Sequence, residues 1–354
     1  MASPELNTFR IIDANLNRIG EGLRLLEEVA RMILNDVNLT QQLKTMRHQI
    51  LETDKRFNQR LLQARDSEGD VGINLEAPPK KEPELPDILV ANSRRVQESL
   101  RTIEELAKIP ETGLDTEKFK KARFDLYTIE RNLLSKLLRQ DKVKRLSGLY
   151  VIVDTQALLQ RRHIDVARAA ISGGARAIQL RDKISTKKEL LPIAEQLKQL
   201  CADYNVLFII NDHLDLLLAV DADGLHLGQD DLPIKLTRRL LPIDKILGIS
   251  TRTVDGAVAA QAEGADYIAV GAMYPTPSKK AAQVVGIARL SQVRKAVTLP
   301  LVAIGGINQE NAAAVMAAGA DSIAVIRAVI QAQAPEKAAR ELVNIIEASK
   351  TVDR

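Results

Sequence analysis

From about residue 146 onward, short runs of β-branched and apolar residues alternate with stretches of helical periodicity. Each run is followed by one helical stretch, which is typical of parallel strands joined by helices. The pattern predicts an α/β fold, a closed (β/α)₈ or TIM barrel. A doubly wound open sheet is the alternative, but no glycine-rich dinucleotide turn follows the first run. The expected strands cover residues 149–153, 177–180, 206–210, 224–227, 246–249, 267–270, 301–304 and 322–325.

A recurring tripeptide supports this division. Gly174-Ala175-Arg176, Gly264-Ala265-Asp266 and Gly319-Ala320-Asp321 stand where a helical stretch ends and a strand begins. Glycine is the usual residue just past the end of a helix, because it adopts a left-handed backbone at little cost.

The first 140 or so residues follow a different pattern, with apolar residues at every third or fourth position. This periodicity predicts amphipathic helices at about 4–33, 39–62, 87–108 and 115–138. The stretch 66–86 is rich in Gly, Pro and charge, so we expect a long mobile connection there.

This half also contains an internal repeat, which predicts a duplicated helical hairpin packed as a four-helix unit. Asn15, Arg18, Glu21, Leu23, Arg24, Glu27, Glu28 and Ala30 reappear at constant spacing as Asn92, Arg95, Glu98, Leu100, Arg101, Glu104, Glu105 and Ala107. With a one-residue slip, Lys44 and Arg47 match Lys120 and Arg123.

The length of 354 residues suits two domains. We expect an all-α domain at 1–141 and a barrel domain at 142–354, joined by the basic linker Lys142–Arg145. No apolar run approaches the ~20 residues of a membrane span, and the N-terminus lacks the features of a signal peptide. The single cysteine, Cys201, suits a reducing compartment. These observations predict a cytoplasmic protein with no membrane partner.

Charge and aromatic content argue against nucleic acid as a partner. The 50 basic and 46 acidic residues are interspersed, and the chain has no Trp and only 3% aromatic residues. Little is therefore available to stack on bases or to track a phosphate backbone. The oligomeric state is not determined by these numbers, and a homo-oligomer remains open.

The polar residues that end the expected strands are the candidate site, because parallel barrels carry their active sites there. The second strand ends Gln179-Leu180-Arg181-Asp182-Lys183. Alternation places Gln179, Arg181 and Lys183 on one face, as an amide and two cations. From the residues alone, this cluster is either an anion site or a solvated strand end.

Carboxylates follow the next two strands, as Asn211-Asp212 and as Gln229-Asp230-Asp231. Beside a cationic cluster they suit Mg²⁺ that bridges carboxylates to phosphate oxygens, which indicates a diphosphate ligand. The alternative is that Asp230 or Asp231 caps the following helix.

Later strand ends add hydroxyl groups and glycines. Ser250 ends the fifth strand, and Thr276-Pro277-Ser278-Lys279 lies in a long loop that could close over a substrate. Gly305-Gly306 and Ile326-Arg327 follow the last two strands, where backbone N–H groups commonly hold a phosphate. The four histidines lack the spacing of a zinc site, and we expect a structural role for His213.

Taken in order, the motifs QLRDK, ND, HLGQDD, GIS, TPSK and AIGGI resemble those of thiamine-phosphate synthases, across about 146–348. The resemblance implies a transferase that joins a pyrimidine methyl diphosphate to a thiazole phosphate with the aid of Mg²⁺. It implies Asp212 and Asp231 as Mg²⁺ ligands. The implied pyrimidine diphosphate contacts are Gln179, Leu180, Arg181, Asp182, Lys183, Asn211, Ser250 and Lys279. The implied thiazole phosphate contacts are Thr276, Pro277, Ser278, Gly306, Ile326 and Arg327, where Arg327 replaces a residue that is often Ser in the family.

The implied chemistry suits these residue types, with Arg181, Lys183 and Ser250 as the catalytic candidates. Loss of diphosphate leaves a pyrimidinylmethyl cation, so the main task is to stabilise the departing charge. The thiazole nitrogen attacks with a free lone pair, so no catalytic base is required. A thiazole tautomerase-like barrel and a non-catalytic, phosphometabolite-binding regulator are the competing hypotheses.

The first half resembles a helical domain fused ahead of such synthases in some bacteria, which is suspected of phosphorylating the pyrimidine precursor. The repeated Asn, Arg and Glu residues carry this resemblance. No glycine-rich phosphate loop is present there, so the residues themselves do not support a kinase. An ion-pair network between helices is the alternative role.

Overall fold

The computed structural model describes residues 4–65, 83–276 and 283–352. It divides into two compact units, the first up to Leu138 and the second from Arg139 onward. This boundary lies inside a helix. Most of the expected connection 66–86 falls outside the described residues. No helix in the described part of the chain is long and apolar enough to cross a bilayer.

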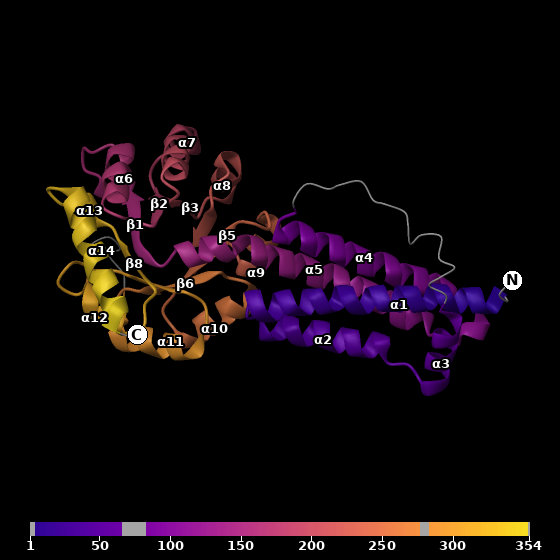
Figure 1. Cartoon of the computed structure of the whole chain (residues 1–354). Helices are drawn as coiled ribbons and strands as arrows, with labels where there is room; N and C mark the ends of the chain where they lie inside the picture. Colours follow the sequence, from indigo (N-terminus) through magenta and orange to yellow (C-terminus); the bar gives the residue numbers. More distant parts are fainter. Residues whose placement is uncertain (1–3, 66–82, 277–282, 353–354) are drawn as a thin grey trace. The chain divides into compact units, whose positions relative to one another are not determined.

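The described part of the first unit contains helices and no strand, as expected, and α1 packs against α2, α3 and α4 in it (Figure 1). Its core is built from the apolar stripes of these helices, with Ile12, Ile19 and Leu23 fully buried on α1. The elements are α1 (Pro4–Glu28), the π-helix η1 (Val29–Ile33), α2 (Val37–Leu51), α3 (Lys55–Ala64), α4 (Leu85–Leu106), the 3₁₀ turn η2 (Pro110–Thr112) and α5 (Thr116–Arg145).

Two expectations for this half were wrong in detail. The helix expected at 39–62 is two helices, because the chain becomes extended at Glu52 and Asp54 caps a new helix by accepting the Phe57 N–H at 2.8 Å. The expected linker Lys142–Arg145 is the last turn of α5. It remains helical because it has partners in the second unit, which are described below.

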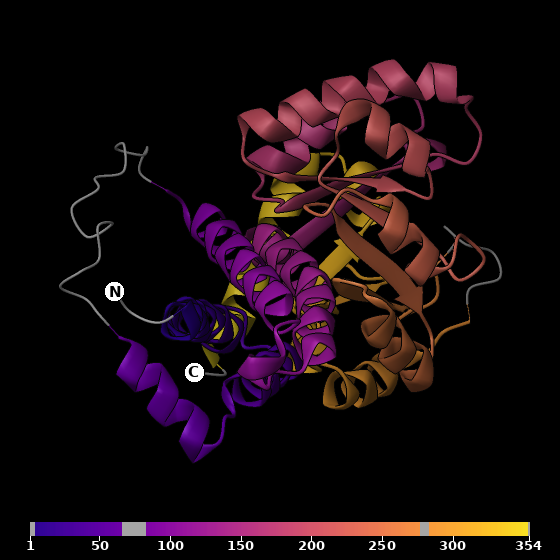
Figure 2. The same ribbon diagram turned by 90° about the vertical axis from the view of Figure 1, so that its right-hand side faces the viewer.

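The second unit is a closed barrel of eight parallel strands in sequence order, β1 to β8, which confirms the barrel prediction. Its helices lie outside the strands (Figure 2). The strands are β1 (Gly148–Asp154), β2 (Ala177–Arg181), β3 (Leu207–Asn211), β4 (Gly224–Leu227), β5 (Ile246–Thr251), β6 (Tyr267–Gly271), β7 (Leu301–Ile304) and β8 (Ser322–Val325). The helices are α6 (His163–Ser172), α7 (Lys187–Asp203), α8 (Leu214–Val220), α9 (Ile234–Leu240), α10 (Val254–Glu263), α11 (Gly286–Ala296), α12 (Ala312–Ala317), α13 (Arg327–Ile330) and α14 (Pro335–Val352), with the 3₁₀ turn η3 (Thr155–Ala157).

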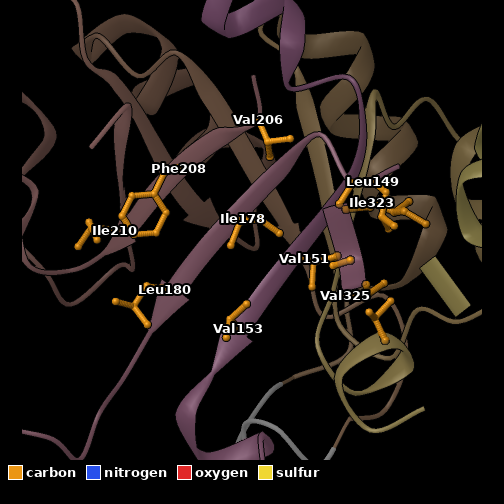
Figure 3. Packing of buried hydrophobic residues seen from close by; sticks show 14 of the residues in the cluster. Leu149, Val151, Val153, Ile178, Leu180, Val206, Phe208, Ile210, Ile323 and Val325 are labelled. Carbon is orange, nitrogen blue, oxygen red and sulfur yellow. The ribbon is translucent and has the colours of Figure 1, made fainter. Parts of the chain in front are cut away.

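Alternation along the strands creates two cores. Leu149, Val151 and Val153 of β1 point outward, beside Ile178 and Leu180 of β2, and pack beneath the helices (Figure 3). The residues between them point inward and fill the barrel, and these include two buried tyrosines. The inner cluster contains Leu146, Tyr150, Ile152, Ala177, Leu207, Ile209, Ile246, Tyr267, Ala269, Val302 and Ala324.

Three aspartates link strands to helices at the end of the barrel where the strands begin. Each precedes an even-numbered strand and accepts the backbone N–H of the odd-numbered strand before it, and each also pairs with a helix cation. The bonds to backbone are Asp223 to Phe208 (3.0 Å), Asp266 to Leu247 (2.8 Å) and Asp321 to Leu301 (2.8 Å). The ion pairs are with Lys198 (3.5 Å), Arg238 (2.5 Å) and Arg294 (2.9 Å).

The C-terminal turns of α5 belong to this same end. Arg139 is buried and donates to Asp266 at 2.8 Å, while Lys142 donates to Asp244 at 3.0 Å. Leu146, just after the helix, is fully buried in the inner core. These contacts explain why α5 continues through the expected linker.

Candidate active site

A cavity of about 650 Å³ opens at the carboxyl ends of the strands. This is where parallel barrels bind ligands. The structure places eleven of the expected site residues on its wall: Gln179, Arg181, Lys183, Asn211, Asp212, Asp231, Ser250, Thr276, Gly306, Ile326 and Arg327. Pro277, Ser278 and Lys279 lie outside the described residues.

Leu180 and Asp182 are not on the wall of this cavity. Leu180 faces outward into the core beneath the helices. The Asp182 carboxylate turns into its own loop, where it accepts the N–H groups of Ile184 at 2.7 Å and Ser185 at 2.8 Å. Burial opposes ionisation of Asp182, but these hydrogen bonds outweigh it and lower its pKa. The strand alternation accounts for this split within the QLRDK motif.

The two cations of β2 are held by carboxylates from neighbouring strands. Arg181 pairs with Asp154, a buried residue at the end of β1. Lys183 is exposed and pairs with Asp212 after β3. The guanidinium and the ammonium group therefore reach the cavity from the same strand, each on a fixed partner.

Asp212 and Asp231 meet at the mouth. Burial raises the pKa of Asp212, and the carboxyl group of Asp231 beside it adds to the rise. Burial opposes ionisation of Asp231 too, but the hydrogen bond from Asp212 and that from the Gly228 N–H at 2.7 Å lower its pKa. The two carboxyl groups are therefore close enough for the charge of Asp231 to oppose ionisation of Asp212.

Local backbone geometry also marks this pair. Asp212 has φ +64°, a left-handed conformation that is uncommon outside glycine, and its N–H is fixed by the His226 carbonyl at 2.9 Å. Neither Asp230 nor Asp231 is the N-cap of α9, because Pro233 takes that position. The helix-cap alternative is therefore wrong.

Glycine and helix ends form the other side of the cavity. Gly306 has φ +68°, and a Cβ there would lie 2.7 Å from the Pro275 carbonyl oxygen, so no larger residue fits. Ile326 is the N-cap of the short helix α13, which begins at Arg327. The Arg327 side chain is exposed on the cavity wall.

Sequence reasoning missed a polar network inside the barrel, made by Tyr150, His226 and Tyr267, all on the cavity wall. Burial lowers the pKa of His226 to about 4 and raises that of Tyr267 well above its ordinary value. Their positions in the sequence could have identified them, because each is a polar residue at a place in a strand where the side chain faces the inside of the barrel. His213 is not on the wall.

Comparisons with known proteins agree with this geometry. The family model described as thiamine monophosphate synthase matches residues 149–329. A thiamine-phosphate synthase from Nostoc punctiforme is 39% identical over 328 residues, which cover 92% of this chain and 91% of that one. The chain belongs to the thiamine-phosphate synthase family.

Other relatives extend the likeness over both units. A thiamine-phosphate synthase from Synechocystis sp. is 40% identical over 339 residues, 94% of each chain. The ThiD2 family model matches residues 10–132 of the helical unit. Among solved structures, the thiamine phosphate pyrophosphorylase from Pyrococcus furiosus is 39% identical, with a TM-score of 0.54, and covers 58% of this chain and 98% of that one.

Proposed function

We propose that the barrel unit condenses a pyrimidine methyl diphosphate with a thiazole phosphate, giving thiamine phosphate and inorganic diphosphate. The observation that carries this function is the meeting of Arg181, Lys183 and the Asp212–Asp231 pair at one cavity mouth, in a member of the synthase family. Two cations beside two neighbouring carboxylates suit a magnesium-bound ligand with several negative charges.

The reaction divides naturally between substrate and protein. The bond between the pyrimidine methylene carbon and the diphosphate oxygen breaks, and its electron pair leaves with diphosphate. Arg181 and Lys183 stabilise that charge, and Gln179 and Asn211 contribute polar contacts on the same wall. The thiazole nitrogen then forms the new C–N bond with its own lone pair, so no side chain has to remove a proton.

The carboxyl pair fits magnesium. In the described part of the chain, no group of three or more His, Cys, Asp or Glu side chains could hold a metal. Mg²⁺ commonly binds one or two carboxylates and completes its shell with substrate phosphates and water. Asp212 and Asp231 would hold it, and when bound it would neutralise charge on the diphosphate. A divalent cation would also offset the repulsion between the two neighbouring carboxylates.

The thiazole phosphate belongs on the opposite wall. Gly306, Ile326 and Arg327 would bind its phosphate, and Thr276 lies on the wall of the same cavity. The contacts expected of Pro277, Ser278 and Lys279 stay predictions. No ion pair joins the Arg327 guanidinium to another described residue, so this side chain can supply a charge-assisted contact to the phosphate in place of a hydroxyl group. The pyrimidine diphosphate contacts expected of Leu180 and Asp182 remain predictions.

We propose that the helical unit is a separate domain made of a duplicated hairpin. Matching contacts support the duplication: Asn15 and Asn92 each donate to the carbonyl four residues earlier at 2.8 Å. The buried Glu27 pairs with Arg47 as the buried Glu104 pairs with Arg123. A cytoplasmic location and a homo-oligomeric state remain predictions.

A single assay with the purified full chain tests the function. Diphosphate release should require both substrates and Mg²⁺, and thiamine phosphate should form in equal amount. A tautomerase would instead act on a thiazole phosphate alone, and a regulator would bind phosphate esters without turnover. Either of those results would overturn the proposal.

A further inference from the structure

A continuous line of hydrogen bonds crosses the inside of the barrel. Gln179 Nε2 donates to the Tyr150 hydroxyl at 2.8 Å, and the Tyr150 and Tyr267 hydroxyl oxygens are 3.2 Å apart. Tyr267 Oη lies 3.0 Å from His226 Nδ1, and His226 Nε2 lies 2.9 Å from Ser250 Oγ. Gln179 and Ser250, on opposite sides of the cavity, are thereby joined through three side chains.

A glycine in β5 leaves room for the side chains of this line. A Cβ on Gly248 of β5 would lie 2.0 Å from Cζ of the Tyr267 ring, so the ring occupies the space that a side chain would fill. The His226 ring stacks on Tyr267, with centroids 5.6 Å apart. Both residues are buried, so water does not compete for their hydrogen bonds.

The Gln179 amide, at one end of the line, favours one direction of donation along the whole series of hydrogen bonds. An amide N–H can only donate, so the Tyr150 oxygen accepts from Gln179, which leaves its own hydroxyl hydrogen available to Tyr267. In this order the Tyr267 hydroxyl donates a hydrogen bond to Nδ1 of His226, and the ring hydrogen is on Nε2. Nε2–H donates to Ser250 Oγ, and the Ser250 proton is left for the cavity.

We propose that Tyr150, Tyr267 and His226 are positioning residues that make Ser250 a hydrogen-bond donor toward the anionic substrate. This inference rests on the proposed function for the identity of the anion, but the order of the hydrogen bonds stands apart from it. Ser250 is the residue that touches the substrate. The other three act through it by fixing where its proton points.

Nitrogen NMR of the full chain labelled with ¹⁵N-histidine tests the order directly. The chain has four histidines, and replacing His48, His163 and His213 one at a time identifies the remaining signal as His226. We expect the one-bond N–H coupling at Nε2 and none at Nδ1. A hydrogen on Nδ1 with Nε2 bare would overturn the proposal, because Ser250 would then donate to the ring.

A double-mutant cycle tests the consequence for turnover. Ser250→Ala should lower kcat by ~10² to 10³-fold, since it removes a preorganised donor. His226→Leu should lower kcat by roughly tenfold to a hundredfold, and His226→Gln by less, because its amide can still donate to Ser250. The KM for the thiazole phosphate should hardly change.

The combined variant decides between positioning and independent action. If His226 acts through Ser250, His226→Leu in the Ser250→Ala background should cause less than a twofold further loss. Fully multiplicative losses would overturn the proposal. Ser322→Ala is the control, because its buried hydroxyl bonds a carbonyl at the far end of the barrel, 2.6 Å from Gly148 O. If the wild-type chain forms no thiamine phosphate, the proposed function fails while the NMR result still reports the hydrogen-bond order.

Discussion

At the scale of single residues, the Arg181 guanidinium depends on Asp154, a carboxylate that is not on the cavity wall. Asp154 is buried, holds the Arg181 guanidinium and also accepts the Gln156 N–H at 3.0 Å. Asp154→Asn keeps the shape but removes the charge, so Arg181 loses its fixed position. We expect kcat/KM for the pyrimidine diphosphate to fall roughly tenfold to a hundredfold, as small misplacements of binding groups do. Steady-state kinetics checks this, and an unchanged value would contradict the anchoring role.

Lys183 and Lys187 make a matched pair of lysines. Each forms an ion pair with an aspartate, Lys183 with Asp212 and Lys187 with Asp215, but Lys183 alone of the two lies on the cavity wall. Lys183→Ala should lower kcat by ~10² to 10³-fold, the usual cost of one preorganised charge. Lys187→Ala should leave kcat within twofold. Equal effects from the two substitutions would rule out a special role for Lys183.

Single residues were predictable where strand alternation and strand ends determine them. Gln179, Arg181 and Lys183 share the cavity wall because side chains on a strand alternate. Tyr150 and Tyr267 were missed because aromatic residues inside a strand are typical of a core. Their hydrogen bonds connect strands that are far apart in the sequence, and no local pattern encodes such a contact.

At the scale of elements, caps determine where helices begin. Asp36 accepts the Leu39 N–H at 2.9 Å at the start of α2 and pairs with Lys136 of α5. Asp36→Ala should lower the free energy of unfolding by about 0.5–2 kcal/mol, the usual cost of losing such a cap. Chemical denaturation of the variant and the wild type at pH 7 measures the difference.

Because the cap is a carboxylate, its contribution to stability depends on pH. Burial opposes ionisation of Asp36, yet the hydrogen bonds from Lys136 and Leu39 lower its pKa below the ordinary 3.8. A lowered folded-state pKa contributes stability that is present above 3.8 and lost as the pH falls through the folded value. The difference in free energy of unfolding between the wild type and Asp36→Ala should therefore become smaller only below pH 3.8. A gap that narrowed at higher pH would assign the effect to another group.

Elements with a strong period were predictable, and their ends were less so. The strand β4 has the expected bounds, because buried apolar runs between glycines and polar residues define a strand sharply. The break between α2 and α3 was missed because Ile50, Phe57 and Leu61 keep one helical register on the two sides of the polar stretch 52–56. Asp54 is an N-cap type of residue, but the same residue is also common inside helices.

At the scale of the whole molecule, the residue at which a barrel fragment begins determines whether the fragment keeps its stabilising ion pairs and its activity. Arg139 and Lys142 form ion pairs at the end where the strands begin. A fragment that starts at Lys136 keeps both residues, so we expect it to fold and to retain kcat/KM within about threefold, because every proposed site residue lies in the barrel unit.

A second fragment that starts at Lys142 loses Arg139 and leaves Asp266 with Arg238 alone. Its free energy of unfolding should be lower by about 2 kcal/mol, the typical value of a hydrogen bond to a charged group. Circular dichroism and thermal unfolding compare the two fragments. A folded Lys136 fragment without activity would mean that the helical unit completes the active site.

The aspartates that close the start of the barrel have a consequence for how such a protein can change. Asp223, Asp266 and Asp321 fasten strands and helices at one end, while the cavity lies at the other. A population of variants can therefore explore new substrates through the loops that follow the strands without drawing on the same interactions that keep the chain folded. Directed evolution confined to those loops should yield more folded variants than an equal number of changes at the aspartate end.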